Sequence, residues 1–464
     1  MMKIRSFLAL AITGVMLFAS CSNNDEIPDQ STGNDGDTWA AFNIKLPKTM
    51  ETRAADPNAS AAETAVNSVA VYLFDANEHL TTSGIKTMAE YGTVNSTDNT
   101  ISTKIALRTK SGEVKIWVVL NPTDAIHASI MDNISRGNLP FQTAFDAAVS
   151  DVTGGISNTT ETTSKGFVMV NKAIATKTLA SGITNDAAIS GKDEAANHFT
   201  INVERAVAKV AVISNKADLK DLNTLPELGS FSDIKYSVCQ VNPQMYLARY
   251  TDKTIQSGGY NIVTPDNNFD GKVSGSPATY WGNKVMDTAP LAVNASGTAK
   301  KDLNGIYILE NSMITPFQQN ATYVLVQAVW TPKVVYQADG STTGTLAASK
   351  DFWYSATTRK YYMEDPTDPQ ASDAKQWSNG ICYYRVYLYD KYTDNTPDAD
   401  GTRFYDVVRN TCYNVTLNSM HAPGENVPTP AAPGPDPIEE PTYLSVDVNI
   451  AAWTFANMDD QDLQ

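Results

Sequence analysis

Alternation of apolar and polar residues over short stretches is the main pattern along this chain. In residues 39–46, the apolar side chains of Phe42, Ile44 and Leu46 are separated by small or polar residues. A period of two is expected of a β-strand with one face buried. The stretch that follows, residues 48–61, is small, polar and unpatterned, and it predicts an exposed loop open to proteolysis.

Further strand candidates recur at irregular spacing, and most are rich in β-branched and aromatic residues. They are residues 68–75, 112–121, 203–213, 234–241, 305–310, 322–330, 381–389 and 411–417. The stretch 203–213 fits a helical period as well, but its β-branched residues favour a strand. Helical spacing is clearer in residues 139–149, where Phe141, Phe145 and Val149 share one face.

Scarcity of amphipathic helices decides the fold class. An α/β fold would alternate strands with such helices, so we expect a mainly β chain of two antiparallel β-sandwich domains with few short helices. Polar residues 214–221 suggest the domain boundary. The predicted organisation is a leader at 1–20, a first strand followed by the exposed loop, two sandwiches of which the second spans 216–421, and a linker with a final strand at 422–464.

The C-terminal tail repeats the opening pattern after an unusual linker. Residues 422–441 contain seven prolines, which predicts a stiff, extended and non-packing segment. Beyond the linker, apolar side chains again occupy every second position, and an aromatic residue follows them. These residues are Leu444, Val446, Val448, Ile450 and Trp453.

The first residues have the order of a lipoprotein export signal. Lys3 and Arg5 precede an apolar run over 6–18, and small residues lead to Cys21. The run is shorter than the roughly 20 residues that span a bilayer. We therefore expect cleavage before Cys21 and lipid on its thiol. The alternative is an ordinary secretory signal with an incidental cysteine.

Charge and cysteine content narrow the function classes. A net charge of −16 and a pI near 4.7 argue against a nucleic-acid partner, because phosphate binding needs clustered basic residues. Beyond Cys21 the chain has Cys239, Cys382 and Cys412, and no C-x-x-C pair that would predict structural zinc. A bridge between Cys382 and Cys412 is one open possibility.

Motifs of enzymes and metal sites are missing from the sequence. The chain has no H-E-x-x-H, G-x-S-x-G, P-loop or G-x-G-x-x-G pattern. The acidic stretch 390–400 lacks the glycine and glutamate of a calcium loop, since Asn395 and Gly401 hold those places. Paired aromatics such as Trp353-Tyr354 fit either core packing or a carbohydrate platform. We expect no enzyme activity, metal or cofactor.

Two similar strands at opposite ends of one chain suggest assembly. Sheet edges with unpaired N–H and C=O groups accept any strand of suitable pattern. If the first strand is removed by a cut in the loop after it, an apolar groove opens and a strand from another copy can fill it. Because donor and groove are different surfaces, such contacts propagate as an open filament.

The order of several short blocks resembles a known family. The blocks are Tyr72-Leu-Phe-Asp75, Trp117-Val-Val-Leu-Asn-Pro122, Val203-Glu-Arg-Ala-Val-Ala-Lys-Val210, Tyr307-Ile-Leu-Glu-Asn311 with Thr322-Tyr323, and Val408-Arg-Asn410 with Tyr413. With the leader before them and the final strand after them, the chain is similar to the fimbrillins, the shaft subunits of Bacteroidales type V pili. It most resembles those of the shorter, minor fimbria.

This resemblance implies a complete assembly route and transthyretin-like sandwiches. The precursor would be anchored at the outer membrane through Cys21. An arginine-specific protease would cut after Arg53, so residues 21–53 would be a propeptide with a removable strand, and the first sandwich would span 54–215 with Ala54 as the mature N-terminus. Arg53 is the only arginine between Arg5 and Arg108. A neighbour's C-terminal strand would then replace the first strand in a cell-surface fimbrium. Implied partners are other copies, accessory, tip and anchor subunits, and host or bacterial surface ligands that support adhesion and biofilm formation.

Several alternatives stay open at this stage. Arg53 fits an ordinary linker arginine, and the final strand fits permanent completion of its own sheet. An accessory or tip subunit would share the same features as a shaft subunit. A lipid-anchored glycan-binding surface protein that never polymerises is the competing hypothesis from another class.

Overall fold

The computed structural model describes residues 36–47, 65–95, 98–135, 166–214, 216, 219–241, 247, 250–251, 262–263, 289–290, 292–293, 305–311, 317–318, 320–389, 392–393, 396–397, 405–428, 438 and 444–452. Within this part of the chain strands far outnumber helices. The prediction of a mainly β fold with few short helices is confirmed. No helix among these residues is both long and apolar enough to cross a membrane.

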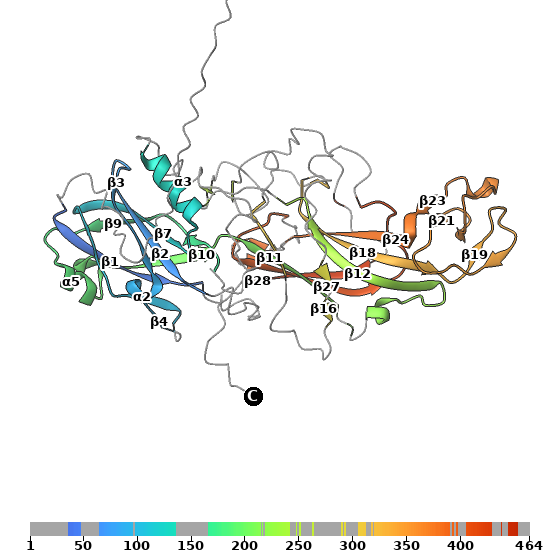
Figure 1. The fold of residues 1–464 in the computed structure, drawn as a ribbon, viewed down its shortest axis with the longest axis horizontal. Helices are drawn as coiled ribbons and strands as arrows, with labels where there is room; N and C mark the ends of the chain where they lie inside the picture. Colours follow the sequence, from blue (N-terminus) through green and yellow to red (C-terminus); the bar gives the residue numbers. More distant parts are fainter. Residues whose placement is uncertain are drawn as a thin grey trace, which may run out of the picture.

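A ten-stranded sheet forms the first half, shown in blue to green in Figure 1. Its strands are β1 (Thr38–Lys45), β2 (Ser68–Asp75), β3 (Leu80–Thr87), β4 (Gly92–Asn95), β5 (Thr100–Thr103), β6 (Leu107–Thr109), β7 (Gly112–Leu120), β8 (Met169–Asn171), β9 (Ala175–Leu179) and β10 (His198–Arg205). Their main order is β3-β2-β7-β8-β10-β1-β5-β4, with β6 on β1 and β9 on β7. The helices are α2 (Met88–Tyr91), α3 (Asp124–Ser135) and α5 (Asn185–Ser190).

This sheet folds over one apolar core. Alternate residues of β2 and β7, among them Val71 and Ile116, share a buried cluster with residues of β1, β5 and β10, among them Ile44, Ile101 and Phe199. The two layers follow from the period-two pattern of each strand, which places every second side chain on the inner face. The other face of β2 and β7 packs against α3.

Three sheets build the second half, drawn in green to red in Figure 1. The first contains β11 (Ala208–Ser214), β16 (Ala292–Val293), β17 (Ile306–Ile308), β27 (Thr411–Met420) and β28 (Leu444–Ala452). The second contains β12 (Gly229–Cys239), β15 (Ala289–Pro290), β18 (Tyr323–Pro332) and β24 (Ile381–Tyr387). A small distal sheet contains β19 (Val335–Tyr336), β20 (Thr343–Gly344), β21 (Phe352–Ser355), β22 (Lys360–Tyr362) and β23 (Lys375–Trp377).

The remaining elements of this half are short. They are the hairpins β13 (Tyr250–Thr251) with β14 (Ile262–Val263) and β25 (Tyr392–Thr393) with β26 (Thr396–Pro397), and several single 3₁₀ turns. The two larger sheets face each other across one core that includes Val212, Val326 and Val415. Phe352 and Trp377 of the distal sheet stack in the same core, with ring centroids 5.4 Å apart.

The passage from one half to the other takes only two residues. β10 ends at Arg205 and β11 begins at Ala208, and Ala206 and Val207 between them are fully buried. The predicted strand 203–213 is therefore two strands in two different sheets. The chain thus passes from the sheet of the first half to a sheet of the second half before residue 215, where the domain boundary was predicted. That boundary stays a prediction.

Most predicted strands appear close to their expected bounds, and β2 has the predicted bounds. Pairing is mostly antiparallel, but β1 runs parallel to β10 and β11 runs parallel to β27. Parallel pairs need long crossover connections, and the sequence gives no local signal for them. The helix predicted over 139–149 lies outside the described residues.

Candidate assembly site

The first strand, β1, lies inside the first sheet. On one side it pairs in parallel with β10, with Phe42 opposite Phe199, and on the other it pairs antiparallel with β5 and β6. Figure 1 shows β1 beside β10 in the left half of the molecule. An interior strand leaves two unpaired edges if it is removed.

The inner face of β1 carries the three predicted side chains. Phe42, Ile44 and Leu46 are 1%, 0% and 2% exposed, and all three belong to the core of the first half. The ring of Phe42 stacks on that of Phe199 with centroids 6.0 Å apart. These residues therefore occupy an apolar slot between β10 and β5, which we call the β1 slot.

The outer face of β1 is covered as well. Ala41 is fully buried against Ala106 and against Ala188 of α5, and Trp39 packs on the same cluster. Thr184 caps α5 by accepting a hydrogen bond from the amide of Ala187. Because a methyl group meets methyl groups here, the β1 slot has room only for a small side chain at this position.

Buried polar contacts fix the beginning of β1. The hydroxyl of Thr38 donates to the carbonyl of Ala180 at 2.7 Å and accepts from the amide of Ile183 at 3.2 Å. It also accepts from Nδ2 of Asn197 at 3.0 Å, and Thr38 and Asn197 are both essentially unexposed. A hydroxyl with three buried partners sets a strict chemical requirement at this position.

Two further contacts hold the middle of β1. The buried hydroxyl of Tyr91 donates to the carbonyl of Phe42 at 2.6 Å, and burial raises the pKa of this phenol well above its ordinary value. The amide of Thr103 donates to Oδ1 of Asn43 at 3.0 Å. The first contact recognises backbone, so any strand in this place can make it, whereas the second needs an acceptor side chain.

An exposed acidic residue precedes the strand. Asp37 accepts hydrogen bonds from the amide and the hydroxyl of Ser111, both at 2.6 Å. These bonds, that from the hydroxyl first, lower the pKa of the Asp37 carboxyl below its ordinary value. Sequence patterns gave no sign of this contact, because Ser111 is distant in the chain.

The C-terminal strand, β28, lies at the edge of the first sheet of the second half. Among the described strands it pairs with β27 alone, antiparallel, with Val448 opposite Val415 and Ile450 opposite Tyr413. Leu444 is 5% exposed and Val446 is partly buried, and both pack on the core of that half. In this structure β28 is therefore seated in its own subunit.

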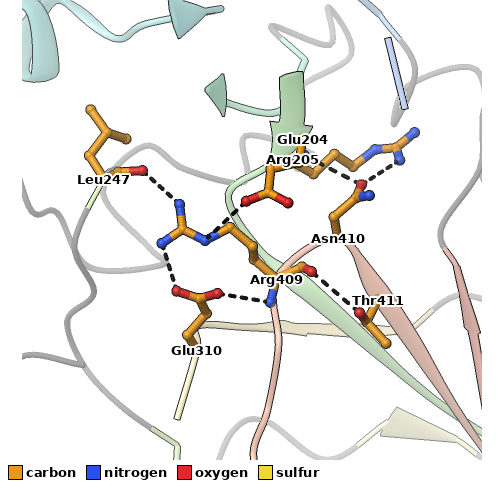
Figure 2. Close-up of polar contacts among 7 residues, drawn as sticks. All are labelled: Glu204, Arg205, Leu247, Glu310, Arg409, Asn410 and Thr411. Carbon is orange, nitrogen blue, oxygen red and sulfur yellow. Dashed lines mark hydrogen bonds and ion pairs between the residues drawn. The ribbon is translucent and has the colours of Figure 1, made fainter. Parts of the chain in front are cut away.

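A buried polar cluster joins the two halves (Figure 2). Arg409 is 1% exposed; its Nη2 donates to Glu310 Oε2 at 2.6 Å and its Nη1 to the carbonyl of Leu247 at 2.6 Å. Glu204 at the end of β10 lies 4.0 Å from Nε of Arg409. Burial opposes the charge of Arg409, but Glu310 and then Glu204 keep its pKa above the ordinary value.

The neighbouring residues extend this joint. The amide of Asn410 donates a hydrogen bond to the carbonyl of Val207. Oδ1 of Asn410 accepts hydrogen bonds from the backbone amide and the side chain of Arg205 (Figure 2). Residues 203–210, 307–311 and 408–410, three of the blocks that resemble fimbrillins, therefore meet in this one cluster. The role of Glu204, Glu310 and Arg409 was missed, because they lie on separate segments and no spacing rule connects them.

Some predicted site residues fall outside the described residues. They are Cys21, Arg53, Ala54 and Trp453. For Val448 and Ile450 the structure describes the backbone register on β27 but not the side chains. Their roles stay predictions.

The three cysteines are buried, and the aromatic residue Tyr354 packs against another ring. Cys239, Cys382 and Cys412 are buried free thiols, so the bridge considered between Cys382 and Cys412 is not formed here. Tyr354 packs on Tyr361, with ring centroids 4.9 Å apart, as core and edge packing predicts. In the described part of the chain no group of three metal-ligating side chains gathers.

The sequence of this chain is similar to those of known fimbrial subunits. Residues 375–459 match the family model described as major fimbrial subunit protein type IV, fimbrillin, C-terminal. The minor fimbrium subunit Mfa1 of Porphyromonas gingivalis is 23% identical across 99% of this chain and 99% of its own length. The resemblance to the fimbrillins is confirmed. A solved fimbrilin of Porphyromonas gingivalis covers 90% of this chain and 99% of its own, with 14% identity and a TM-score of 0.44.

The fimbrillin model covers the elements at issue here. It extends from β23 to beyond β28 and includes Arg409 and the β27–β28 pair. The Mfa1 match extends over the rest of the chain and so includes β1. Both strands of the candidate assembly site therefore lie in segments that resemble fimbrillins.

Proposed function

We propose that this chain is the structural subunit of a surface fimbrium that polymerises by donor-strand exchange. Export as a lipoprotein on Cys21 precedes a cut after Arg53, and Ala54 becomes the mature N-terminus. Release of β1 then empties the β1 slot, and the C-terminal strand of a second copy fills it. The filament supports adhesion through ligands on host or bacterial surfaces, and accessory, tip and anchor subunits complete it.

One observation carries the proposal: β1 is an interior strand, and the segment that connects it to β2, the next described strand, contains Arg53. Phe42, Ile44 and Leu46 are buried, yet β1 stands apart in sequence from the next strand, β2. A cut in this connection allows β1 to leave, which exposes one edge of β10 and one edge of β5, while their other edges stay paired with β8 and β4. Exposed apolar edges of this kind favour uptake of a new strand.

The likeness to fimbrial subunits supports the same role. The matched family model and the relative Mfa1 are both fimbrial by name. No reaction is part of the proposed function, since a filament subunit acts by binding its neighbours.

A direct test compares processed and unprocessed chains. The chain from Ser22 onward is incubated with an arginine-specific protease, and Arg53→Ala serves as the uncut control. We expect SDS-resistant ladders and fibres only from the cut chain, with mature subunits that begin at Ala54 by mass. Monomers from the cut chain, or equal ladders from the control, would contradict the proposal.

The donor strand has its own test. Val446→Asp and Val448→Asp place a charge on the apolar face, and burial of an unpaired carboxylate in the slot is strongly unfavourable. We expect folded monomers that form no fibres. Asn449→Asp adds the same charge on the polar face and should still polymerise. Fibres of normal length from the two valine variants would exclude this role for the tail.

A second candidate function follows from the position of β28. Because β28 already pairs with β27 of its own chain, it fits a subunit that keeps its last strand and only accepts a neighbour's. Such a subunit would end a filament as a tip or accessory protein. Immunogold labelling separates the two roles, since a shaft subunit labels along the fibre and a terminal subunit labels one end.

A further inference from the structure

The two ends of the chain match position by position, beyond their shared alternation. Residues 38–46 read Thr-Trp-Ala-Ala-Phe-Asn-Ile-Lys-Leu, and residues 442–450 read Thr-Tyr-Leu-Ser-Val-Asp-Val-Asn-Ile. Both begin with a hydroxyl residue and an aromatic residue, and both have a small residue at the fourth place. The contacts of β1 say which of these similarities matter.

We infer that a second copy's C-terminal strand enters the β1 slot in a single register, with Thr442 in the place of Thr38, Ser445 in that of Ala41 and Asp447 in that of Asn43. This inference rests on the proposed function and adds the register and the residues that fix it. The strand runs as β1 does, parallel to β10 and antiparallel to β5 and β6.

The hydroxyl at the start of the strand is the first determinant. The partners of Thr38 are the carbonyl of Ala180, the amide of Ile183 and Nδ2 of Asn197. Thr442 restores a hydroxyl among them. A slip of two residues brings Glu440 or Leu444 to this position instead, and either leaves buried polar groups without the correct partner.

The covered outer face is the second determinant. At Ala41 the β1 slot is closed by Ala106 and by Ala188 of α5, so only a small side chain fits. Ser445 meets this requirement. The two-residue slips place Tyr443 or Asp447 there, the first too large for the space and the second a carboxylate in an apolar contact. A slip of one residue turns the polar face of the strand into the core.

The remaining positions are compatible with this register. The carboxylate of Asp447 can accept the hydrogen bond that the amide of Thr103 gives to Asn43. On the inner face Leu444 is larger than Ala40, while Val446 is smaller than Phe42. Adjacent changes of opposite sign keep the total volume similar, which cores tolerate better than a net gain or loss.

Cysteine cross-linking reads the register directly. Lys45 of β1 pairs with Thr100 of β5, and its Nζ lies 3.2 Å from the Thr100 hydroxyl. The inferred register puts Asn449 of the incoming strand in the place of Lys45. Directly opposed residues of antiparallel strands have Cα separations that suit a disulfide. In the uncut chain Asn449 faces Asn414 of β27, far along the sequence from Thr100.

The experiment uses the chain from Ser22 onward, cut after Arg53, with Thr100→Cys combined in turn with Asn449→Cys, Asp447→Cys or Ala451→Cys. The native cysteines beyond Cys21 are buried, which limits side reactions. We expect a covalent ladder without reductant from the Asn449→Cys pair alone. Each of the other two pairs reports one two-residue slip.

Every outcome is informative. Fibres that cross-link through position 447 or 451, or through none of the three, would overturn the register but leave the proposed function standing. Cut chains that form no fibres at all would overturn both. Uncut chains that cross-link equally would contradict exchange between copies.

A second measurement tests the hydroxyl. Thr442→Val should slow fibre formation about tenfold, because a buried set of polar partners loses its match. Thr442→Ser retains the hydroxyl and should assemble at nearly the original rate. Equal rates for the two variants would overturn the role of Thr442.

Discussion

Strands β1 and β28 have the same alternating pattern but very different surroundings. β1 has a strand on each side and cover on both faces, whereas β28 has β27 on one side and no described strand on the other. The pattern of a strand therefore does not say whether it lies inside a sheet or at its edge. The two strands differ in how easily they can leave. β28 leaves when its hydrogen bonds to β27 break, whereas β1 must break its hydrogen bonds to strands on both sides and withdraw its side chains from the core.

This difference gives exchange a direction. An edge strand that moves into an interior slot gains cover for its second face and exchanges one ladder of hydrogen bonds for two. Each aliphatic side chain that becomes fully buried adds about 1.5–3 kcal/mol. Under the proposed function the uncut chain does not exchange strands, because β1 occupies the better site.

The largest expected difference between β1 and β28 appears when one apolar side chain on each strand is shortened to alanine. Phe42→Ala in the uncut chain removes a side chain that is 1% exposed and should cost about 3–5 kcal/mol of unfolding free energy. Val446→Ala at the edge should cost only about 1 kcal/mol. Urea unfolding measures both, and equal losses would mean that the two strands are equally essential to the precursor.

The joint between the halves provides the next test. Arg409→Met leaves Glu310 buried without its cation and should cost about 3–5 kcal/mol. Lys177→Met, whose partner Glu194 is mostly exposed, is the matched control and should cost less than about 1 kcal/mol. If the joint couples the two halves in unfolding, Arg409→Met should also give two unfolding transitions where the original chain gives one. The same number of transitions in both chains would show that the coupling does not depend on Arg409.

A smaller effect is expected at the backbone contact of β1. Tyr91→Phe removes the hydrogen bond to the carbonyl of Phe42 and should cost about 1–2 kcal/mol. Because this contact recognises backbone, the same loss should appear in fibres after exchange. Thermal unfolding of precursor and fibre measures it, and a loss confined to the precursor would mean that the incoming strand does not pass Tyr91.

The smallest effect concerns pH. The hydrogen bonds from Ser111 lower the pKa of Asp37, so their contribution is complete above the ordinary value of 3.8 and is lost as the pH falls below it. Asp37→Asn should remove this part of the acid sensitivity. Urea midpoints of both chains at neutral and acid pH give the difference, and identical acid shifts would contradict the assignment.

Prediction from the sequence worked where the physical cause is local. β2, β7 and β18 have buried β-branched and aromatic side chains and were expected close to their observed bounds. β3 and β9 consist largely of Thr, Lys and Ser, because they lie at the periphery and need no strong apolar pattern. The sequence therefore does not mark them.

In the candidate assembly site, too, the residues with a local sequence pattern were predicted and the others were not. The alternating residues of β1 and β28 were visible, but Asn197, Tyr91 and Ala188 around β1 were not. Each contributes through a contact with a distant segment, and no short-range spacing predicts such contacts. Parallel pairing of β1 with β10 escaped prediction for the same reason.

The most direct measurement is a map of the assembled fibre at a resolution that identifies side chains. The strand between β10 and β5 should read as residues 442–450 of a neighbouring copy, with Ser445 against Ala188. Density for Trp39 and Phe42 in that place, with β28 still on its own β27, would contradict the account.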